Sequence, residues 1–100
     1  MLYAHNDDMA LGAIQAIEDA GKKPGTDIII VSVDALKTAF EAMVAGKLNC
    51  TVECNPLLGP KVLKTVQKVL AGEAVQKTLY MKDEVFDRST AKDVIDSRQY

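Results

Sequence analysis

Apolar and polar positions along this chain fall into blocks of helix and strand length. Residues 8–20 carry Ala10, Ala13, Ile14 and Ile17 at the i, i+3, i+4 and i+7 spacing of one helix face. Polar side chains occupy most of the positions between them. This spacing predicts an amphipathic helix over the segment.

A nearly continuous run of β-branched residues follows, from Ile28 to Val33. The absence of polar alternation predicts a strand covered on both faces, as in a parallel sheet between helices. The same criteria predict a strand over 2–4, helices over 36–45 and 57–71, a strand over 48–54, an extended segment over 78–86, and a last amphipathic turn capped by Ser89 or Thr90. The alternating order predicts an α/β fold with a mainly parallel sheet.

Composition narrows the classes of partner. The 100 residues are 48% hydrophobic and 26% charged, with a formal net charge of −2 and no cluster of basic residues, so nucleic acid is not an expected partner. No apolar run reaches the roughly 18 residues of a membrane span, so no membrane insertion is expected. Residues 1–4 also lack the features of an export signal.

The two cysteines, Cys50 and Cys54, stand four positions apart in a predicted strand. That spacing separates their Cα atoms by about 13 Å, whereas a disulfide needs about 7 Å or less. With His5 as the single histidine, a zinc site lacks ligands. We expect both cysteines to be small packing residues, with the reactivity of Cys54 left open.

Polar side chains collect where predicted strands end. They are Asn6 and Asp7 after the first strand, Asp34 after the second, and Glu53, Cys54 and Asn55 at the close of the third. In a parallel sheet these positions share the carboxyl edge, where open α/β sheets bind ligands. Amide and carboxylate groups together suit vicinal hydroxyls, and no glycine-rich phosphate loop is present. The pattern predicts a site for a small polyhydroxylated ligand.

The residues at the start of the first predicted helix also have a purely structural interpretation. Asn6, Asp7 and Asp8 can cap that helix and complement its dipole. With three polar clusters at one edge, we assign ligand contact to Asn6 and the start of the helix to Asp7 and Asp8. Catalysis has little support, because His5 has no nucleophile at a motif spacing. Asp83, Glu84 and Asp87 are expected to form a solvated charged face.

Three ordered motifs resemble the C-terminal part of type I periplasmic sugar-binding proteins, in the ribose- and galactofuranose-binding group of ABC transporters. They are residues 6–13 (NDDMALGA), 29–34 (IIVSVD) and 50–56 (CTVECNP). The resemblance implies a flavodoxin-like α/β half of a two-lobed protein. It implies a monosaccharide ligand, a transporter permease as partner of the complete protein, a periplasmic location, and neither enzymatic activity nor a cofactor.

By this resemblance, Asn6 and Asp34 hydrogen-bond sugar hydroxyls, and a third contact comes from the hinge around Cys54 and Asn55. Ribose-binding members carry Gln in that region, so Cys54 departs from them. Ala35 also departs from the family, which usually has Gly after the aspartate, and this is expected to alter the turn.

The resemblance further divides the chain. Residues 1–54 correspond to the C-terminal lobe, 55–78 to a hinge and a helix of the other lobe, and 79–100 to a return segment and terminal helix. A complete member is about three times as long, so we expect a fragment that binds weakly or not at all alone. None of the five aromatic residues is placed as a platform for a sugar ring; they are Tyr3, Phe40, Tyr80, Phe86 and Tyr100.

Two alternatives stay open from the sequence. One is the effector-sensing core of a lactose-repressor-type transcription regulator, which shares this fold but here lacks a helix-turn-helix segment. The other is an α/β fragment without binding activity that self-associates through an exposed sheet edge.

Overall fold

The computed structural model describes all 100 residues and contains one mixed sheet with helices. The elements are β1 (Leu2–Tyr3), α1 (Asp7–Asp19), β2 (Ile30–Asp34), α2 (Lys37–Val44), β3 (Cys50–Glu53), α3 (Gly59–Leu70), β4 (Val85–Asp87), α4 (Arg88–Val94) and a 3₁₀ turn (Ile95–Ser97). Each predicted helix and strand is present, with ends shifted by one or two residues, except in the segment over 78–86. There only the last residues form a strand.

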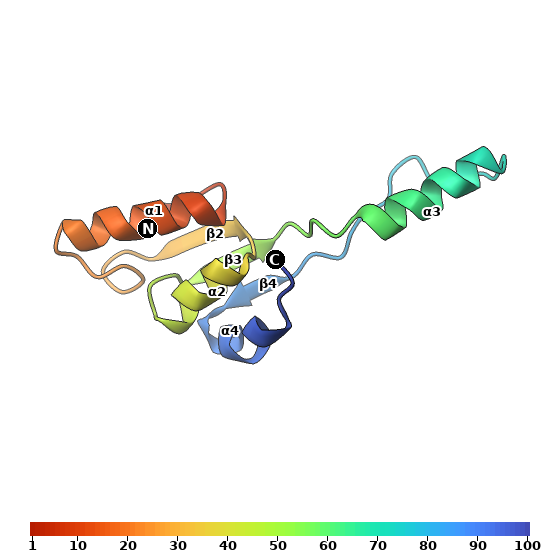
Figure 1. The fold of residues 1–100 in the computed structure, drawn as a ribbon. Helices are drawn as coiled ribbons and strands as arrows, with labels where there is room; N and C mark the ends of the chain where they lie inside the picture. Colours follow the sequence, from red (N-terminus) through yellow and green to blue (C-terminus); the bar gives the residue numbers. More distant parts are fainter.

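The sheet has the order β1-β2-β3-β4, and the first three strands are parallel (Figure 1). β4 pairs with β3 in the antiparallel sense, with Phe86 opposite Thr51. The predicted α/β fold with a mainly parallel sheet is therefore confirmed. The antiparallel strand is the part that the sequence pattern did not show.

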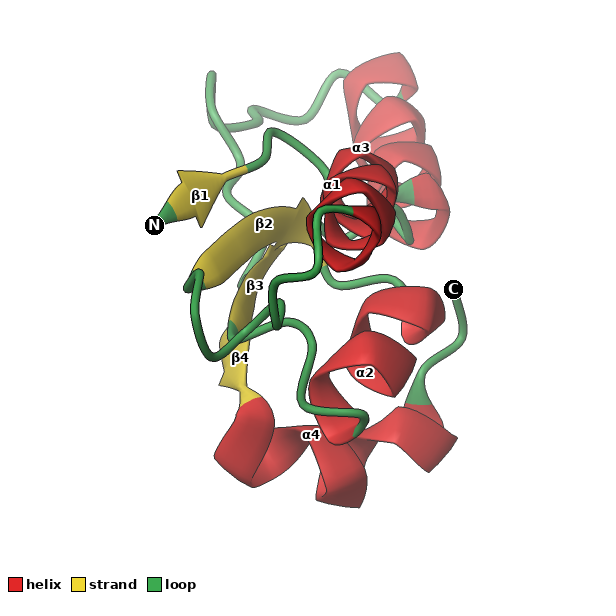
Figure 2. Ribbon diagram, turned by 90° about the vertical axis from the view of Figure 1, so that its left-hand side faces the viewer, coloured by secondary structure: helices red, strands yellow, loops and turns green.

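One face of the sheet carries the hydrophobic core. Helices α1, α2 and α4 lie on that side, while the opposite face is uncovered (Figure 2). Ile14 and Ile17 of α1, Phe40 and Met43 of α2, and Phe86 of β4 are buried in this core. The prediction that β2 is covered on both faces is wrong for this chain. Within β2, Val31 and Val33 are only half-buried. Ile29 just before β2, Val52 on β3 and Val85 on β4 are 44%, 40% and 68% exposed, because only one helical layer packs on the sheet.

Helix α3 projects away from this body at the end of two extended segments, residues 54–58 and 79–84 (Figure 1). None of its residues is buried. We call residues 55–82 the arm and the rest of the chain the body. The arm gives the molecule its elongated dimensions of 60 × 24 × 15 Å.

Helix α4 begins differently from the prediction. Asp87, rather than Ser89 or Thr90, is its N-cap, and its Oδ1 accepts a hydrogen bond of 2.8 Å from the backbone N–H of Ser89. Asp87 is thus a capping residue as well as part of the charged surface. The hydrogen bonds from Ser89 also hold the pKa of Asp87 below its ordinary value.

Candidate functional site

The carboxyl ends of β1, β2 and β3 meet at one edge of the sheet. Asp34 at the end of β2 pairs with Glu53 at the end of β3, and the N–H of Cys54 donates to the carbonyl of Asp34 over 3.4 Å. The N–H of Ala4 donates to Val31, so the segment leading to Asn6 runs along the same edge. The structure therefore brings the three predicted clusters together.

Asn6 is the N-cap of α1. Its Oδ1 accepts a 2.8 Å hydrogen bond from the N–H of Met9, and its backbone is extended, with φ −148°. Asp7 and Asp8 form the first turn of α1, as expected, while Asn6 supplies the side-chain cap. The side-chain Nδ2 of Asn6 has no partner in the chain and is a free donor for a ligand oxygen.

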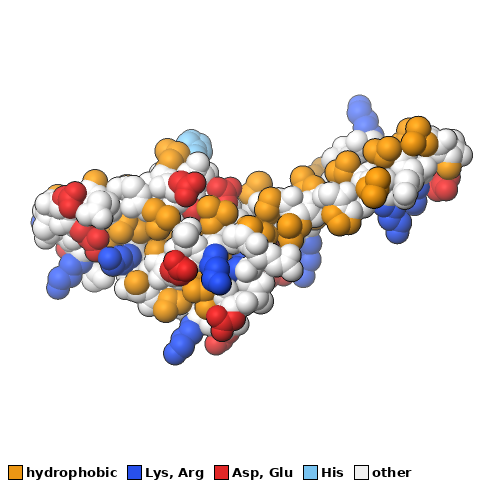
Figure 3. Space-filling model, in the orientation of Figure 1, with side chains coloured by type: hydrophobic (Ala, Val, Ile, Leu, Met, Phe, Trp, Pro, Cys, Tyr) orange, Lys and Arg blue, Asp and Glu red, His pale blue; other side chains and the backbone are white.

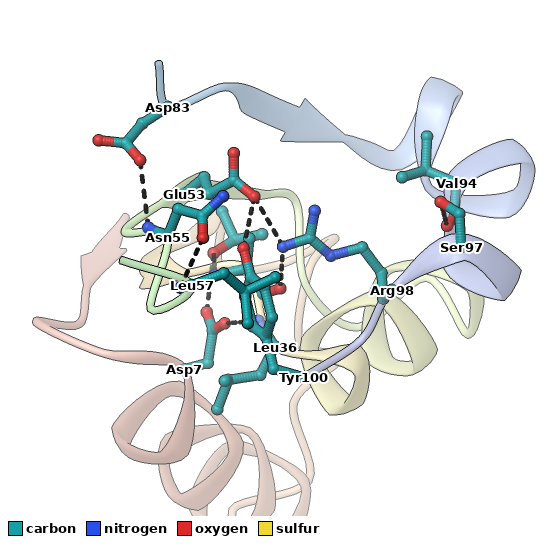
Figure 4. Close-up of polar contacts among 12 residues, drawn as sticks. Asp7, Leu36, Glu53, Asn55, Leu57, Asp83, Val94, Ser97, Arg98 and Tyr100 are labelled. Carbon is teal, nitrogen blue, oxygen red and sulfur yellow. Dashed lines mark hydrogen bonds and ion pairs between the residues drawn. The ribbon is translucent and has the colours of Figure 1, made fainter. Parts of the chain in front are cut away.

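Asp7 is the first residue of α1, but its side chain lies in the interior rather than at the surface. Its side chain is fully buried and accepts hydrogen bonds from Ser32 Oγ (2.5 Å), Thr51 Oγ1 (2.8 Å) and the N–H of Leu36 (2.7 Å). These donors belong to β2, to β3 and to the start of α2. A buried carboxylate needs such partners, and here it links three elements beneath the candidate site (Figure 4).

Asp34 and Ala35 have backbones in the left-handed region, with φ 119° and 63°. The departure from Gly at position 35 therefore does not change the hand of the turn, because Ala35 adopts the conformation that a glycine takes easily. Ala35 is completely buried. We call residues 34–36 the aspartate turn.

Half-buried Asp34 presents its carboxylate at this edge of the sheet. The pKa of its carboxyl lies above the ordinary value, first because burial disfavours the charged form and then because Asp7 and Asp8 place negative charge nearby. A backbone hydrogen bond from Asp7 opposes part of this effect. In its ionised form the carboxylate accepts hydrogen bonds from up to two hydroxyls.

Cys54 and Asn55 follow β3 and lead into the arm. Cys54 is exposed and Cys50 is half-buried, and both thiols are free, as the spacing predicted. The expectation that both pack in the interior is thus wrong for Cys54. Asn55 shapes the local turn, since its Oδ1 accepts from Leu57 (2.8 Å) and its N–H donates to Asp83 Oδ1 (3.1 Å). Asp83, expected to be part of a solvated charged face, therefore also accepts a hydrogen bond from the start of the arm.

A second buried cluster borders the site and was not found from the sequence. Glu53 Oε1 accepts hydrogen bonds from Arg98 Nη2 (2.9 Å) and Tyr100 Oη (2.5 Å), as Figure 4 shows. The Arg98 guanidinium lies over the rings of Phe40, Phe86 and Tyr100 at 4.5–5.2 Å. Glu53 shares the buried face of β3 with Thr51, and that alternation is the one available sequence signal.

The candidate site is an open edge rather than a cavity. An apolar hollow with a volume of about 260 Å³ lies on the arm instead, between α3 and residues 79–81. No cluster of His, Cys, Asp or Glu has the arrangement of a metal site. None of the helices has both the length and the apolar character required to cross a membrane.

Comparisons with known proteins give close relatives over nearly the whole chain. No family model matches. The galactofuranose-binding protein YtfQ of Escherichia coli is 37% identical over 100 residues, which are 99% of this chain and 31% of that protein. The chain thus spans about a third of the length of this curated relative.

Solved structures agree in fold and in extent. A Mycobacterium smegmatis protein in complex with β-D-fucofuranose is 54% identical, with a TM-score of 0.91 over 98% of this chain and 32% of that one. The periplasmic binding protein of a Shewanella arabinose ABC transporter, bound to α- and β-L-arabinofuranose, is 44% identical. Its TM-score is 0.88 over 97% of this chain and 32% of its own length. These relatives are substrate-binding proteins, not enzymes, and nothing in the comparisons supports the transcription-regulator alternative.

Proposed function

Because the chain belongs to the family of type I sugar-binding proteins of ABC transporters, we propose that its carboxyl edge is one wall of a monosaccharide site. Asn6 and Asp34 are the two principal contacts. The observation that carries this proposal is their position at the same edge, with a free amide donor on Asn6 and a half-buried carboxylate on Asp34. A donor and an acceptor side by side match the two roles of a hydroxyl.

The third contact in this proposal comes from the segment after β3. Asn55 uses its Oδ1 and N–H within the chain, but its Nδ2 has no partner there and is a second amide donor. Exposed Cys54 flanks it. The charged and amide groups then approach the sugar from three consecutive strand ends.

The ligand is proposed to be in the furanose ring form. Three of the relatives are associated with furanose sugars, namely galactofuranose, β-D-fucofuranose and L-arabinofuranose. A five-membered ring presents its hydroxyls at different angles from a six-membered ring, so a site built for one discriminates against the other. The ring form is therefore the property of the sugar that we expect the edge to select.

The remaining parts of the proposal concern the complete protein. Residues 1–54 form one lobe, residues 55–78 form a hinge and a helix of the other lobe, and residues 79–100 return to the first lobe. The exposed arm supports this division, because an amphipathic helix without a buried residue lacks the surface on which it packs. The complete protein would act in the periplasm and deliver its sugar to a transporter permease.

The test uses two ligands that differ in ring size alone. The ¹⁵N-labelled chain is titrated with methyl β-D-galactofuranoside and, as matched control, with methyl β-D-galactopyranoside, whose rings cannot interconvert. We expect millimolar affinity for the furanoside, equivalent to roughly 3–4 kcal/mol, because a single wall is present. The shifted signals should be the Asn6 and Asn55 side-chain amides and the Asp34 and Cys54 backbone amides.

Shifts that appear elsewhere, or no shifts with either sugar, would contradict the proposed site. Equal shifts with both sugars would retain the site but reject the furanose preference. Submicromolar affinity would contradict the proposal that a second lobe supplies the other wall.

A further inference from the structure

We propose that Asp7, Thr51 and Arg98 are positioning residues that hold the aspartate turn in a strained shape and so aim Asp34 at the sugar. We call these three residues and their hydrogen bonds to the turn the clamp. The identity of the ligand rests on the proposed function, but the shape of the turn and its restraint by the clamp do not. The sequence placed Asp7 in the polar cluster after the first strand but gave none of the three residues a positioning role, and each acts on the turn rather than on the ligand.

The turn requires restraint because two consecutive residues other than glycine have positive φ. Asp34 has φ 119° and Ala35 has φ 63°. A side chain with Cβ is disfavoured in this region, and such residues persist where the surrounding structure fixes them. Without restraints, the turn would relax toward negative φ and swing the Asp34 carboxylate away from the edge.

Three side chains, from α1, β3 and the segment after the 3₁₀ turn, hold three backbone groups of the aspartate turn. Thr51 Oγ1 on β3 accepts from the N–H of Ala35 at 3.2 Å. Arg98 Nη2, beyond α4, donates to the carbonyl of Ala35 at 2.9 Å. Asp7 Oδ2 on α1 accepts from the N–H of Leu36 at 2.7 Å.

Asp7 connects these restraints. Its Oδ1 accepts from Thr51 Oγ1 at 2.8 Å, which orients the same hydroxyl that accepts from Ala35. It is 0% exposed, so it cannot reach a ligand at the edge itself. Its charge nevertheless acts on Asp34, whose pKa it raises. Asp7 therefore affects the candidate acceptor through geometry and through charge.

The first experiment needs no sugar. In Thr51→Val, nuclear magnetic resonance couplings that report φ should show Ala35 leaving the left-handed region. The double variant Thr51→Val, Ala35→Gly should restore the left-handed backbone conformation at position 35, because glycine takes positive φ without restraint. In Asp7→Asn, the titration of the Asp34 carboxyl should move to lower pH. A left-handed turn that persists in Thr51→Val would overturn the clamp.

Ser32→Ala is the matched control. It removes one hydrogen bond to Asp7 Oδ1 but no bond to the turn. We expect lower stability with an unchanged turn and less than about a twofold change in sugar affinity. If Ser32→Ala reduces affinity as much as Thr51→Val does, the network is only structural and the inference fails.

The second experiment measures furanoside affinity in a double-mutant cycle. Thr51→Val should weaken binding about tenfold in the wild-type background, the scale of a lost hydrogen bond to a charged group. It should have no further effect in the Asp34→Ala background, because it acts through Asp34. Additive losses would overturn the inference. If the wild-type chain binds no sugar, the proposed function fails. The nuclear magnetic resonance couplings of the first experiment still show in that case whether the clamp holds the turn.

Discussion

At the scale of single residues, the buried ion pair of Glu53 and Arg98 fixes the end of the chain to the sheet. Their side chains are 7% and 9% exposed, and Tyr100 completes the hydrogen bonding of Glu53. The carbonyl of Tyr100 also accepts from the N–H of Lys37 at the start of α2. Breaking such a pair on one side leaves an uncompensated buried charge.

We therefore predict that Arg98→Met lowers the free energy of unfolding by about 3–5 kcal/mol. Urea denaturation followed by circular dichroism measures this loss. Lys82→Met is the control, since Lys82 and Glu84 form an exposed pair at 3.4 Å and its loss should change stability by less than about 1 kcal/mol. Equal losses in the two variants would show that Glu53 finds other partners.

The pH dependence of stability follows from the same cluster. Burial raises the pKa of Glu53, but hydrogen bonds from Tyr100 and Arg98 and the charge of Arg98 outweigh it, so the pKa lies below its ordinary 4.5. The stabilisation is present above the unfolded pKa and is lost as the pH falls through the folded value. Asp34, with a raised pKa, acts in the opposite sense.

Comparison of the wild type with Glu53→Gln isolates this contribution. The stability difference between the two should shrink as the pH is lowered from 7 to below 4.5, the ordinary pKa of the group. Denaturant midpoints at several pH values supply the measurement. A difference that stays constant across this range would contradict a depressed pKa for Glu53.

Residue roles were the least predictable level from the sequence. Asn6, Asp7 and Asp8 have similar capping propensities, and only the tertiary structure decides that Asn6 caps while Asp7 turns inward to Ser32 and Thr51. The role of Arg98 was not predictable from the sequence either, because its partners Glu53 and Ala35 lie 45 and 63 positions away.

At the scale of elements, Arg88 ties together the loops at the edge opposite the candidate site. Its Nε donates to the carbonyl of Leu48 (3.0 Å), and its Nη2 donates to those of Gly25 (2.6 Å) and Gly46 (2.5 Å). Gly25 has φ 74°, and a Cβ there would clash with the backbone carbonyl of Gly46 as well as with Arg88 Nη2. This close approach requires glycine.

We predict opposite effects of two glycine substitutions. Gly25→Ala should destabilise the chain by at least about 2 kcal/mol, through left-handed strain and displacement of Arg88. Gly12→Ala should stabilise it by about 1 kcal/mol, because Gly12 lies in α1 with open space around it. Thermal unfolding should show shifts of opposite sign, and a stabilised Gly25→Ala variant would contradict the packing of Arg88.

Helices and strands were predictable from the sequence where apolar spacing and residue type indicate the same element. The 3.6-residue stripe of α1 and the β-branched run of β2 gave helix and strand with small boundary shifts. The direction of β4 was not predictable, because it depends on the return path of the chain from α3 rather than on local spacing. The covering of β2 depends likewise on a second helical layer that these residues do not supply.

At the scale of the whole molecule, the chain exposes more surface than a compact protein of its mass. Its accessible surface is 6700 Å² at 10.8 kDa, about 1,200 Å² above the value for a compact monomer. The radius of gyration is 17.3 Å, against about 13 Å for a compact domain of 100 residues. The excess exceeds the roughly 800 Å² that each partner buries in a standard interface.

Charge is also divided between the two parts. Five lysines and one glutamate give the arm a formal charge of +4, which leaves −6 on the body from the total of −2. Figure 3 shows hydrophobic and lysine side chains exposed along the arm, and Val62, Val66 and Val69 there are 45–54% exposed. A basic amphipathic arm and an acidic body with an uncovered sheet face are complementary surfaces.

We therefore predict that two copies of this chain associate, with the arm of each on the sheet face of the other. Sedimentation equilibrium should show a dimer that weakens with salt, and Val66→Glu should make it monomeric. Gln67→Glu adds the same charge at the neighbouring position and should leave the dimer in place. A wild-type chain that stays monomeric at high concentration would contradict this prediction.

If Asp34 and Asn6 bind a sugar hydroxyl at the carboxyl edge of the sheet, removal of the Asp34 carboxylate must weaken sugar binding. Furanoside titrations of the wild type and Asp34→Ala are followed by ¹⁵N chemical shifts, with Asp19→Ala as a charge-matched control at the far end of α1. We expect at least a tenfold loss of affinity in Asp34→Ala, on the order of the contribution of a charged hydrogen bond, and no loss in Asp19→Ala. Equal affinity in all three proteins would contradict this role of Asp34.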